Sequence, residues 1–405
     1  MFKLLNVRIK LFYFIIILYL YVYNPVFNFI GIGSVKLLLV FFIIYSLFNK
    51  KIIYYLSYFK VEFFFTILLV TYSLLTSLRS NELTFKQGYL FFIWFVESIY
   101  IPILLIVIFI NEFKKYSWEK LILIIGTIAS LLSLILILNP ELNEYVKYTL
   151  IAYSGEENDF YDLIRGFGLA EGLRGSYGMV QGMILGLCLN KVRENWYYLI
   201  IILLLIISIA FNARTGLIAF PVSILILLFS FKFNIRFIIY FIIILSMIYN
   251  IDFSSIDFIT DYQETFDWLS KGFEDITAIF QGSSSNVGDV LFVDEVFLPS
   301  NTFEFIFGTG NFSAGIGRVD NGYYYLLWFG GWMIMMIVFS FLIYMFSRLY
   351  LIQKDHYHTF LFFILLLIFS IKSNYLFNPS GISRLLCFYY VYTILNHKLK
   401  FKYDV

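Results

Sequence analysis

The sequence predicts an all-α polytopic membrane protein with about twelve transmembrane helices and two long extracytoplasmic loops. The chain of 405 residues is 61% hydrophobic and only 14% charged, and its mean hydropathy is +0.83. A soluble domain needs more polar surface than this. Apolar runs of bilayer length recur along the chain, and basic residues concentrate in every second short loop. We expect residues 1–405 to form a single integral membrane domain.

The predicted spans are apolar runs near the length of a helix that crosses a bilayer. They cover residues 11–30, 34–48, 61–78, 89–110, 120–138, 177–190, 196–211, 216–231, 236–250, 322–346, 359–376 and 383–396. The shortest contain about 15 residues, and we expect them to extend into the neighbouring loops. The run 52–59 is either an amphipathic stretch or part of the second span.

The charges orient these spans. With the N-terminus inside, the short inner segments hold 18 of the 29 basic residues, as the positive-inside rule requires. Acidic residues show the opposite bias, since 21 of 27 fall outside or in the fourth span. Both termini are therefore predicted to be cytoplasmic, and the two long loops, 139–176 and 251–321, to be extracytoplasmic.

The second long loop begins with an acidic and aromatic stretch, residues 251–300. The spacing of its apolar residues predicts one or two amphipathic helices that lie on the bundle. The simplest interpretation of its acidic residues is a solvated face.

Several function classes lack their sequence signals. There is no Walker-type phosphate loop, dinucleotide fingerprint, zinc-ligand spacing or Gly-x-Ser-x-Gly elbow. Cys188 and Cys387 lie inside apolar runs, which argues against a disulfide framework or a cysteine metal site. The charges are dispersed among loops, so nucleic acid is not an expected partner. We expect no metal and no cofactor.

Arginines on the predicted outer side are the main candidates for a binding site. Arg165 and Arg174 precede the sixth span among glycines, which allow a close approach of the backbone to a ligand. They are either ligand-binding residues or interfacial arginines that reach lipid headgroups. Arg214 lies in the short turn between the seventh and eighth spans, where a cation is costly unless an anion binds it. That anion is a ligand or an acidic residue of the long loops.

A third group surrounds the start of the tenth span. Arg318, Asp320 and Asn321 precede it, and Tyr323 and Tyr324 share a helix face with Asp320. Asp320 fits an N-cap, a structural role that does not exclude a chemical one. Gly330 and Gly331 would let another helix pack closely.

Arg384, at the outer start of the twelfth span, adds a further cation at the same level. Arginines gathered on the outer side would bind a diphosphate through forked guanidinium contacts and stabilise charge on a departing diphosphate. This expected cluster consists of Arg174, Arg214, Arg318 and Arg384.

At these residues the chain resembles the O-antigen polymerase (Wzy-type) family, which is related to the O-antigen ligases. The resemblance extends over about residues 60–395 and rests on three places. They are Arg174-Gly-Ser-Tyr-Gly, Asn212-Ala-Arg214-Thr-Gly, and Gly308-Thr-Gly310 followed by Asp320-Asn-x9-Gly331. The ligases carry a histidine at the position of Asp320, so the resemblance favours a polymerase.

The resemblance implies a GT-C-like membrane glycosyltransferase of the bacterial inner membrane. Its substrates would be oligosaccharide repeat units linked to undecaprenyl diphosphate, and the growing chain would be transferred to the non-reducing end of a fresh unit. Membrane lipids and a candidate chain-length regulator are further implied partners. The product would be O-antigen, capsule or another exopolysaccharide.

The residues then take expected roles. Asp320 would orient or deprotonate the acceptor hydroxyl, and Arg214 would act on the donor diphosphate. The other expected substrate-binding residues are Arg165, Arg174, Arg318, Arg384, Asn321, Tyr323 and Tyr324. A single displacement is the simpler mechanism, because no dedicated nucleophile stands out.

Three other functions stay open. A non-catalytic membrane scaffold is one of them, although it would not explain the outer arginines. An O-antigen ligase is the alternative within the enzyme class. A flippase or exporter of lipid-linked oligosaccharides is the alternative from another class, although such transporters usually place charges within spans and show repeated halves. Glu97 is the one charge clearly inside a predicted span, and no repeat is evident.

Overall fold

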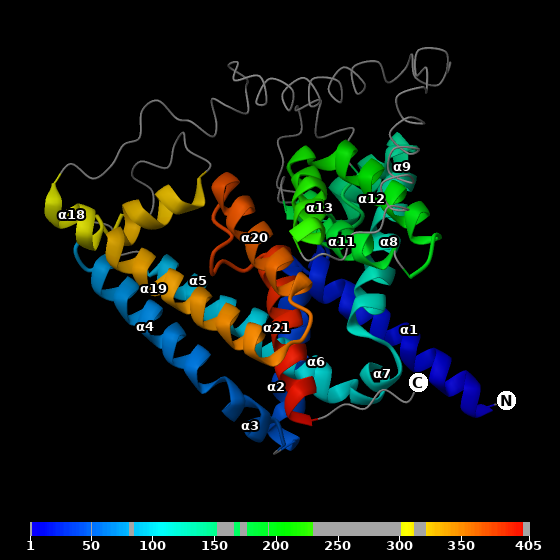
Figure 1. The fold of residues 1–405 in the computed structure, drawn as a ribbon, viewed down its shortest axis with the longest axis horizontal. Helices are drawn as coiled ribbons and strands as arrows, with labels where there is room; N and C mark the ends of the chain where they lie inside the picture. Colours follow the sequence, from blue (N-terminus) through cyan, green and yellow to red (C-terminus); the bar gives the residue numbers. More distant parts are fainter. Residues whose placement is uncertain are drawn as a thin grey trace, which may run out of the picture. The chain divides into compact units, whose positions relative to one another are not determined.

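A computed structural model describes residues 2–49, 51–80, 85–151, 166–170, 176–192, 194–229, 301–311 and 321–399 of the chain (Figure 1). These parts are mostly helical, which agrees with the predicted all-α class. Within them, four helices are long and apolar enough to cross a membrane. They are Lys51–Ser77, Lys86–Ile108, Trp118–Ile137 and Gly322–Ile352. The architecture is that of an α-helical membrane protein.

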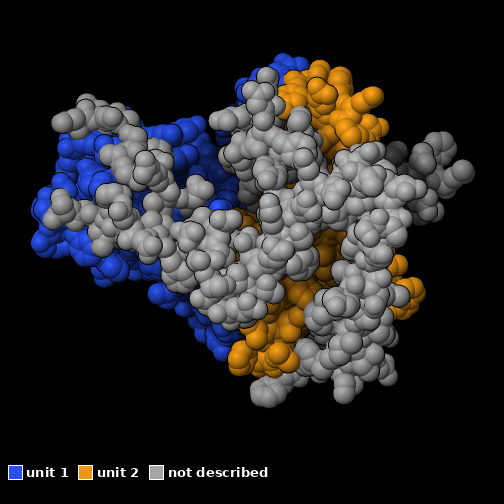
Figure 2. All heavy atoms as spheres, turned by 90° about the horizontal axis from the view of Figure 1, so that it is seen from above, with its two compact units in different colours: residues 1–125, 293–405 blue, residues 126–292 orange. Residues whose placement is uncertain are grey.

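The chain divides into two compact units, coloured separately in Figure 2. Unit 1 comprises residues 1–125 and 293–405, and unit 2 comprises residues 126–292. The boundary falls inside helix α8 (Trp118–Ile137), a mainly apolar helix of 20 residues. Each unit is described separately below.

Unit 1 begins with α1 (Phe2–Tyr23), which ends seven residues before the predicted span does. The backbone of Asn24 has a φ of 45°, and Pro25 follows it with no N–H to donate. The chain then reverses through the short antiparallel strands β1 (Val26–Phe27) and β2 (Ile32–Gly33). The carboxamide oxygen of Asn24 accepts a 2.9 Å hydrogen bond from the Val35 N–H and fixes this turn at the start of α2 (Ser34–Phe48).

The run 52–59 belongs to the following span. Helix α3 (Lys51–Leu56) and the 3-10 turn η1 (Ser57–Phe59) lead directly into α4 (Lys60–Ser77), and together they form one apolar helix of 27 residues. Of the two predicted interpretations of this run, the one that makes it part of the second span is wrong, and the run instead continues into the third span. Asn49 separates it from α2, because its backbone is extended rather than helical.

The fourth predicted span consists of α5 (Lys86–Phe95), the π-helical turn η2 (Val96–Tyr100) and α6 (Ile101–Ile108), followed by α7 (Ile110–Lys115). A π-turn inserts an extra residue into a helix and often marks a functional site. Glu97, the charged residue of this span, lies within the π-turn and is buried.

The C-terminal part of unit 1 contains α18 (Thr302–Phe307), α19 (Gly322–Ile352), α20 (Tyr357–Lys372) and α21 (Gly381–Leu399). Helices α4 and α19 pack against each other (Figure 1). They are antiparallel, because Glu62 near the start of α4 contacts Arg348 near the end of α19. This agrees with the opposite directions predicted for these two spans.

Unit 2 continues α8 into α9 (Pro140–Tyr145) and the π-turn η3 (Val146–Leu150), so the predicted loop 139–176 begins with helical structure. Asn139 caps α9 by accepting a 3.0 Å hydrogen bond from the Leu142 N–H. The unit also contains α11 (Ser176–Lys191), α12 (Tyr198–Asn212), the 3-10 turn η4 (Arg214–Ile218) and α13 (Ala219–Phe229). The predicted span 236–250 and the amphipathic helices of 251–300 lie outside the described residues.

Candidate functional site

The structure joins two of the three sequence motifs within unit 2. The start of α11 packs on the turn between α12 and α13 with almost no side chain between the two backbones. A Cβ atom added to Gly178 would lie 2.6 Å from the Ala213 carbonyl oxygen, and a Cβ at Gly182 would also meet the turn, at the Gly216 backbone. Only glycine permits this approach. The described part of the first motif, residues 176–178, and the turn that contains Arg214 are therefore parts of one local structure.

A fully buried polar network fixes the same region. The Tyr177 hydroxyl donates to the Ala129 carbonyl at 2.9 Å and lies 2.9 Å from the Ser208 hydroxyl. The Gln181 amide donates to the Tyr177 oxygen at 3.1 Å. Buried polar groups in an apolar bundle must find such partners, so the network connects α8, α11 and α12 at defined positions.

Asn212 connects this network to the arginine turn. It is the last residue of α12, is fully buried, and donates from Nδ2 to the Ser133 hydroxyl and the Ser208 carbonyl, at 2.7 Å each. Two residues later Arg214 begins η4, although its side chain is outside the described part of the structure. The backbone at Arg214 is thus held by α8 and α11. Arg165, Arg174, Arg318 and Asp320 lie outside the described residues.

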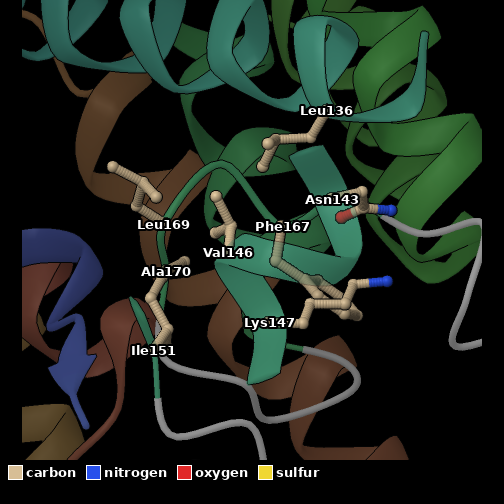
Figure 3. A pocket seen from close by; sticks show the side chains of 8 residues that line it. All are labelled: Leu136, Asn143, Val146, Lys147, Ile151, Phe167, Leu169 and Ala170. Carbon is tan, nitrogen blue, oxygen red and sulfur yellow. The ribbon is translucent and has the colours of Figure 1, made fainter. Parts of the chain in front are cut away.

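A small pocket is formed where the first long loop packs on α8 (Figure 3). It encloses about 260 Å³ of empty space, part of it open to solvent. Its lining is mainly aliphatic, and the side-chain nitrogens of Asn143 and Lys147 point to one side, away from Leu169 and Ile151. The Lys147 ammonium lies 5.8 Å from the centre of the Phe167 ring. These features indicate packing of the loop rather than a cradle for a diphosphate.

In unit 1, Arg384 and Glu97 form a buried ion pair. The Arg384 Nη1 atom lies 3.0 Å from the Glu97 Oε2 atom, and the two side chains are 1% and 6% exposed. The pair is reinforced by Tyr21, whose hydroxyl donates to the Glu97 carbonyl at 2.9 Å. Arg384 therefore lies inside the helix bundle, at the depth of the π-turn. A role of Arg384 in substrate binding stays a prediction.

The first residues of α19 have mainly structural contacts. The side chain of Asn321 caps the helix by accepting hydrogen bonds from the N–H groups of Tyr323, at 3.0 Å, and Tyr324, at 3.4 Å. The sequence suggested Asp320 as the N-cap of this helix, but the N-cap is Asn321. The Tyr323 hydroxyl donates to the Leu367 carbonyl in α20 at 2.7 Å. Tyr324 is half-buried.

The third motif, Gly308-Thr-Gly310 with Gly331, forms a backbone junction. Helix α19 is broken at Gly331, whose φ of 64° and ψ of −165° are accessible essentially only to glycine. The break frees carbonyl groups of the preceding turn. The N–H groups of Thr309 and Gly310 bind the Trp328 and Phe329 carbonyls at 3.0 Å each. The neighbours that approach Gly331 are Ile306, in the last turn of α18, and Gly308 at the start of the following loop. The predicted close packing of another helix at these glycines therefore agrees with the position of α18.

Tyr72 of α4 completes this junction. Its hydroxyl lies 2.8 Å from the Gly330 carbonyl and 3.1 Å from the Phe307 carbonyl, so it contacts both the broken helix and the end of α18. Backbone that leaves the helical path inside a membrane needs such replacement partners. Gly310 also packs on the Thr76 carbonyl of α4. Helices α4, α18 and α19 are thereby joined at one place (Figure 1).

Arg79 lies next to this junction and received no role from the sequence. It follows α4, is exposed, and places its Cζ atom 5.0 Å and 5.4 Å from the ring centres of Phe303 and Phe307 in α18. Among the described residues it makes no ion pair, although Glu304 is a neighbour of Phe303 in the sequence. The sequence feature that could have pointed to Arg79 is its position on the predicted outer side of the membrane, where the positive-inside rule makes basic residues less common.

At the opposite end of the α4–α19 pair, Glu62 and Arg348 form a second ion pair. Glu62 is fully buried, and its Oε1 atom accepts hydrogen bonds from Arg348 and from the Tyr390 hydroxyl of α21. Arg348 also donates to the Tyr58 carbonyl at 2.7 Å. The contacts are internal to the bundle and are sufficient to explain both charges, so we assign them a structural role.

No protein-family model, no curated protein sequence and no solved structure matches this chain. The functional assignment therefore depends on the residues and their geometry.

Proposed function

We propose that this protein is a membrane glycosyltransferase that polymerises oligosaccharide repeat units linked to undecaprenyl diphosphate. The growing chain is transferred from its lipid diphosphate to a new unit, and the product is a surface polysaccharide. The observation that carries the proposal is the packing of Gly178 on Ala213, which joins the motifs of Arg174 and Arg214. Two permanently charged arginines, one from each motif, suit the binding of one diphosphate.

The proposed chemistry needs an acceptor hydroxyl, a departing lipid diphosphate and groups that stabilise the negative charge on it. Arg174 and Arg214 bind the donor diphosphate, with Arg165 and Arg318 as further candidates, and favour its departure by charge stabilisation. Asp320 accepts the proton of the attacking hydroxyl as the glycosidic bond forms. The buried hydrogen bonds of Asn212, two residues before Arg214, support this assignment, because a site that acts by electrostatic stabilisation requires fixed cations.

The test is replacement of Arg214 in cells that assemble the polysaccharide. Arg214→Ala should abolish polymer while one-unit products persist, because assembly and export of single units do not need the polymerase. Arg214→Lys should restore only a small part of the polymer, since lysine lacks the planar guanidinium group that forms paired hydrogen bonds. Polysaccharide length is read by gel electrophoresis, and the protein level by immunoblot.

Lys36→Ala is the matched control, because Lys36 is an exposed cation on the same predicted side of the membrane, at the start of α2. Its polymer should keep the normal length. A normal length distribution in Arg214→Ala at normal protein level would refute the proposed activity.

The buried pair of Arg384 and Glu97 favours a second candidate, export of the same lipid-linked units. Ionisable residues inside membrane bundles often mark transport pathways. The two candidates differ in what accumulates. Loss of an exporter leaves single units on the cytoplasmic side, whereas loss of a polymerase leaves them on the outer side, where an added glycosidase can reach them. The ligase alternative predicts polymer that forms but stays on its lipid carrier.

A further inference from the structure

The side chain of Arg79 meets the conditions for an anion-binding site. It is exposed at the end of α4, and no carboxylate of the described residues forms an ion pair with it. By contrast, Arg384 and Arg348 are each paired with a buried glutamate. Arg79 is thus a permanent cation beside an apolar bundle, with its charge available to a partner outside the described protein.

Aromatic rings define the orientation of this cation. Phe303 and Phe307 are one helical turn apart in α18, their ring centres are 5.0 Å apart, and the guanidinium of Arg79 lies over both. Contact with aromatic faces stabilises a guanidinium and uses none of its N–H groups. The N–H groups lie in the guanidinium plane, so they remain able to form paired hydrogen bonds with phosphate oxygens.

The aromatic platform is itself fixed. Helix α18 ends at Gly308, and the following loop is hydrogen-bonded to the carbonyls of the broken helix α19. Tyr72, seven residues before Arg79 on α4, contacts the Phe307 carbonyl at 3.1 Å. The cation and its platform therefore belong to one anchored junction within unit 1, and a ligand does not have to order them.

The surroundings select the kind of anion. Phe303 is 57% exposed and Ile306 is 37% exposed, so α18 presents apolar surface around the cation. A free phosphate gains nothing from this surface, whereas a lipid places its phosphate at the membrane boundary and its chain against apolar side chains.

We infer that Arg79, held over Phe303 and Phe307, binds a phosphate group of a lipid, and that this group is the diphosphate of the lipid-linked substrate. The second part rests on the proposed function. It assigns a substrate-binding residue to unit 1, next to the motif Gly308-Thr-Gly310.

The direct test is binding of undecaprenyl diphosphate to the full chain in phosphatidylcholine nanodiscs. Arg79→Ala should raise the Kd roughly tenfold to a hundredfold, the range expected for loss of charge-assisted hydrogen bonds. Arg79→Lys should raise it less, since the charge is kept and the fork is lost. Phe303→Leu should also weaken binding, and Lys36→Ala should leave the Kd unchanged. An unchanged Kd in Arg79→Ala overturns the inference.

A second lipid distinguishes the two sources of phosphate. Phosphatidylglycerol, titrated in the same nanodiscs, should bind weakly and respond little to Arg79→Ala. An equal loss of affinity for both lipids in Arg79→Ala would identify a general site for lipid headgroups and overturn the assignment to the substrate.

The polymer assay separates this inference from the proposed function. Suppose that Arg214→Ala makes polymer of normal length while Arg79→Ala binds undecaprenyl diphosphate more weakly. The proposed activity is then refuted, and the lipid phosphate site at Arg79 is supported. If Arg214→Ala abolishes polymer while Arg79→Ala binds the lipid normally, the activity stands and this site fails.

Discussion

The Nη1 atom of Arg384 lies 3.0 Å from the Oε2 atom of Glu97, and both side chains are buried among apolar helices. The pair joins α21 to the π-turn between α5 and α6. A buried charge is tolerated only when a partner compensates for its lost hydration. Each charge therefore compensates for the burial of the other, and this structural role does not exclude a further role of either residue.

Removal of one partner should destabilise the protein strongly. We expect Glu97→Ala to lower the free energy of unfolding by about 3–5 kcal/mol, because Arg384 would remain buried without a counter-charge. The measurement is thermal unfolding of the purified protein in detergent. An unfolding temperature equal to that of the wild type would show that Arg384 has another partner of equal strength.

Exchange of the two charges distinguishes a structural pair from a ligand site. The double variant Glu97→Arg/Arg384→Glu should recover most of the stability lost in Glu97→Ala. If Arg384 also binds the substrate diphosphate, the exchanged protein should fold and yet produce no polymer, since a carboxylate repels the diphosphate. Full recovery of polymer would limit Arg384 to its structural role.

Gly331 should tolerate no side chain. Gly331→Ala places a Cβ in a conformation that is essentially restricted to glycine, and close to the backbone of Ile306 and Gly308. We expect a loss of about 2–3 kcal/mol from backbone strain and displacement of the loop. Gly88→Ala is the control, because Gly88 lies in α5 and its Cβ would find its nearest neighbours, Val70 and Leu74 of α4, at an ordinary 3.6 Å. It should be neutral or stabilising, and an equal loss in both variants would contradict the assigned junction.

Asn212 should matter to both stability and activity. Asn212→Ala removes hydrogen bonds to Ser133 and Ser208, and we expect a loss of about 1–2 kcal/mol. Since Asn212 precedes the arginine turn, polymer length should fall more than protein level does. Ser223→Ala is the matched control, because among the described residues this buried hydroxyl binds only the Ala219 carbonyl of its own helix. Similar polymer from both variants would argue against a positioning role of Asn212.

Variants of Glu62 and Arg348 test whether the two residues of this ion pair contribute to stability together. Arg348 is 19% exposed, so we expect Glu62→Leu alone to cost about 2–3 kcal/mol, less than loss of a fully buried partner. The double variant Glu62→Leu/Arg348→Met should cost less than either single change, because no charge is left unpaired. Additive losses, measured by unfolding in detergent, would mean that the two residues act independently.

Hydropathy predicted most helix positions closely, and it failed where the backbone leaves the helix for local reasons. The predicted span 34–48 coincides with α2, and the span at 322 begins with α19. The first span ends early because of Asn24, whose carboxamide binds the start of α2. Hydropathy measures composition, so it does not register such a turn. The joining of 52–59 to α4 was missed for the same reason.

The sequence allowed the motif residues of the candidate site to be predicted, but not the contacts that they make. The motifs with Gly178, Gly216 and Gly331 were visible, and each proves to allow a close backbone approach. The partner of Glu97 was not predictable, since it lies 287 residues away along the chain. The role of Arg79 depends on α18, a short helix that hydropathy does not detect. Side-chain pairing across distant segments is set by tertiary packing, which a single sequence does not display.

The separation of Glu97 and Arg384 also constrains how this protein is made. Glu97 is synthesised well before Arg384. At a ribosomal rate of about 5–20 residues per second, the 287 intervening residues take roughly 15–60 s. During that interval the carboxylate must be shielded by the insertion machinery or by water. A chain that terminates before residue 384 never acquires this counter-charge, so the ion pair can form only after the segment between the two residues has been made.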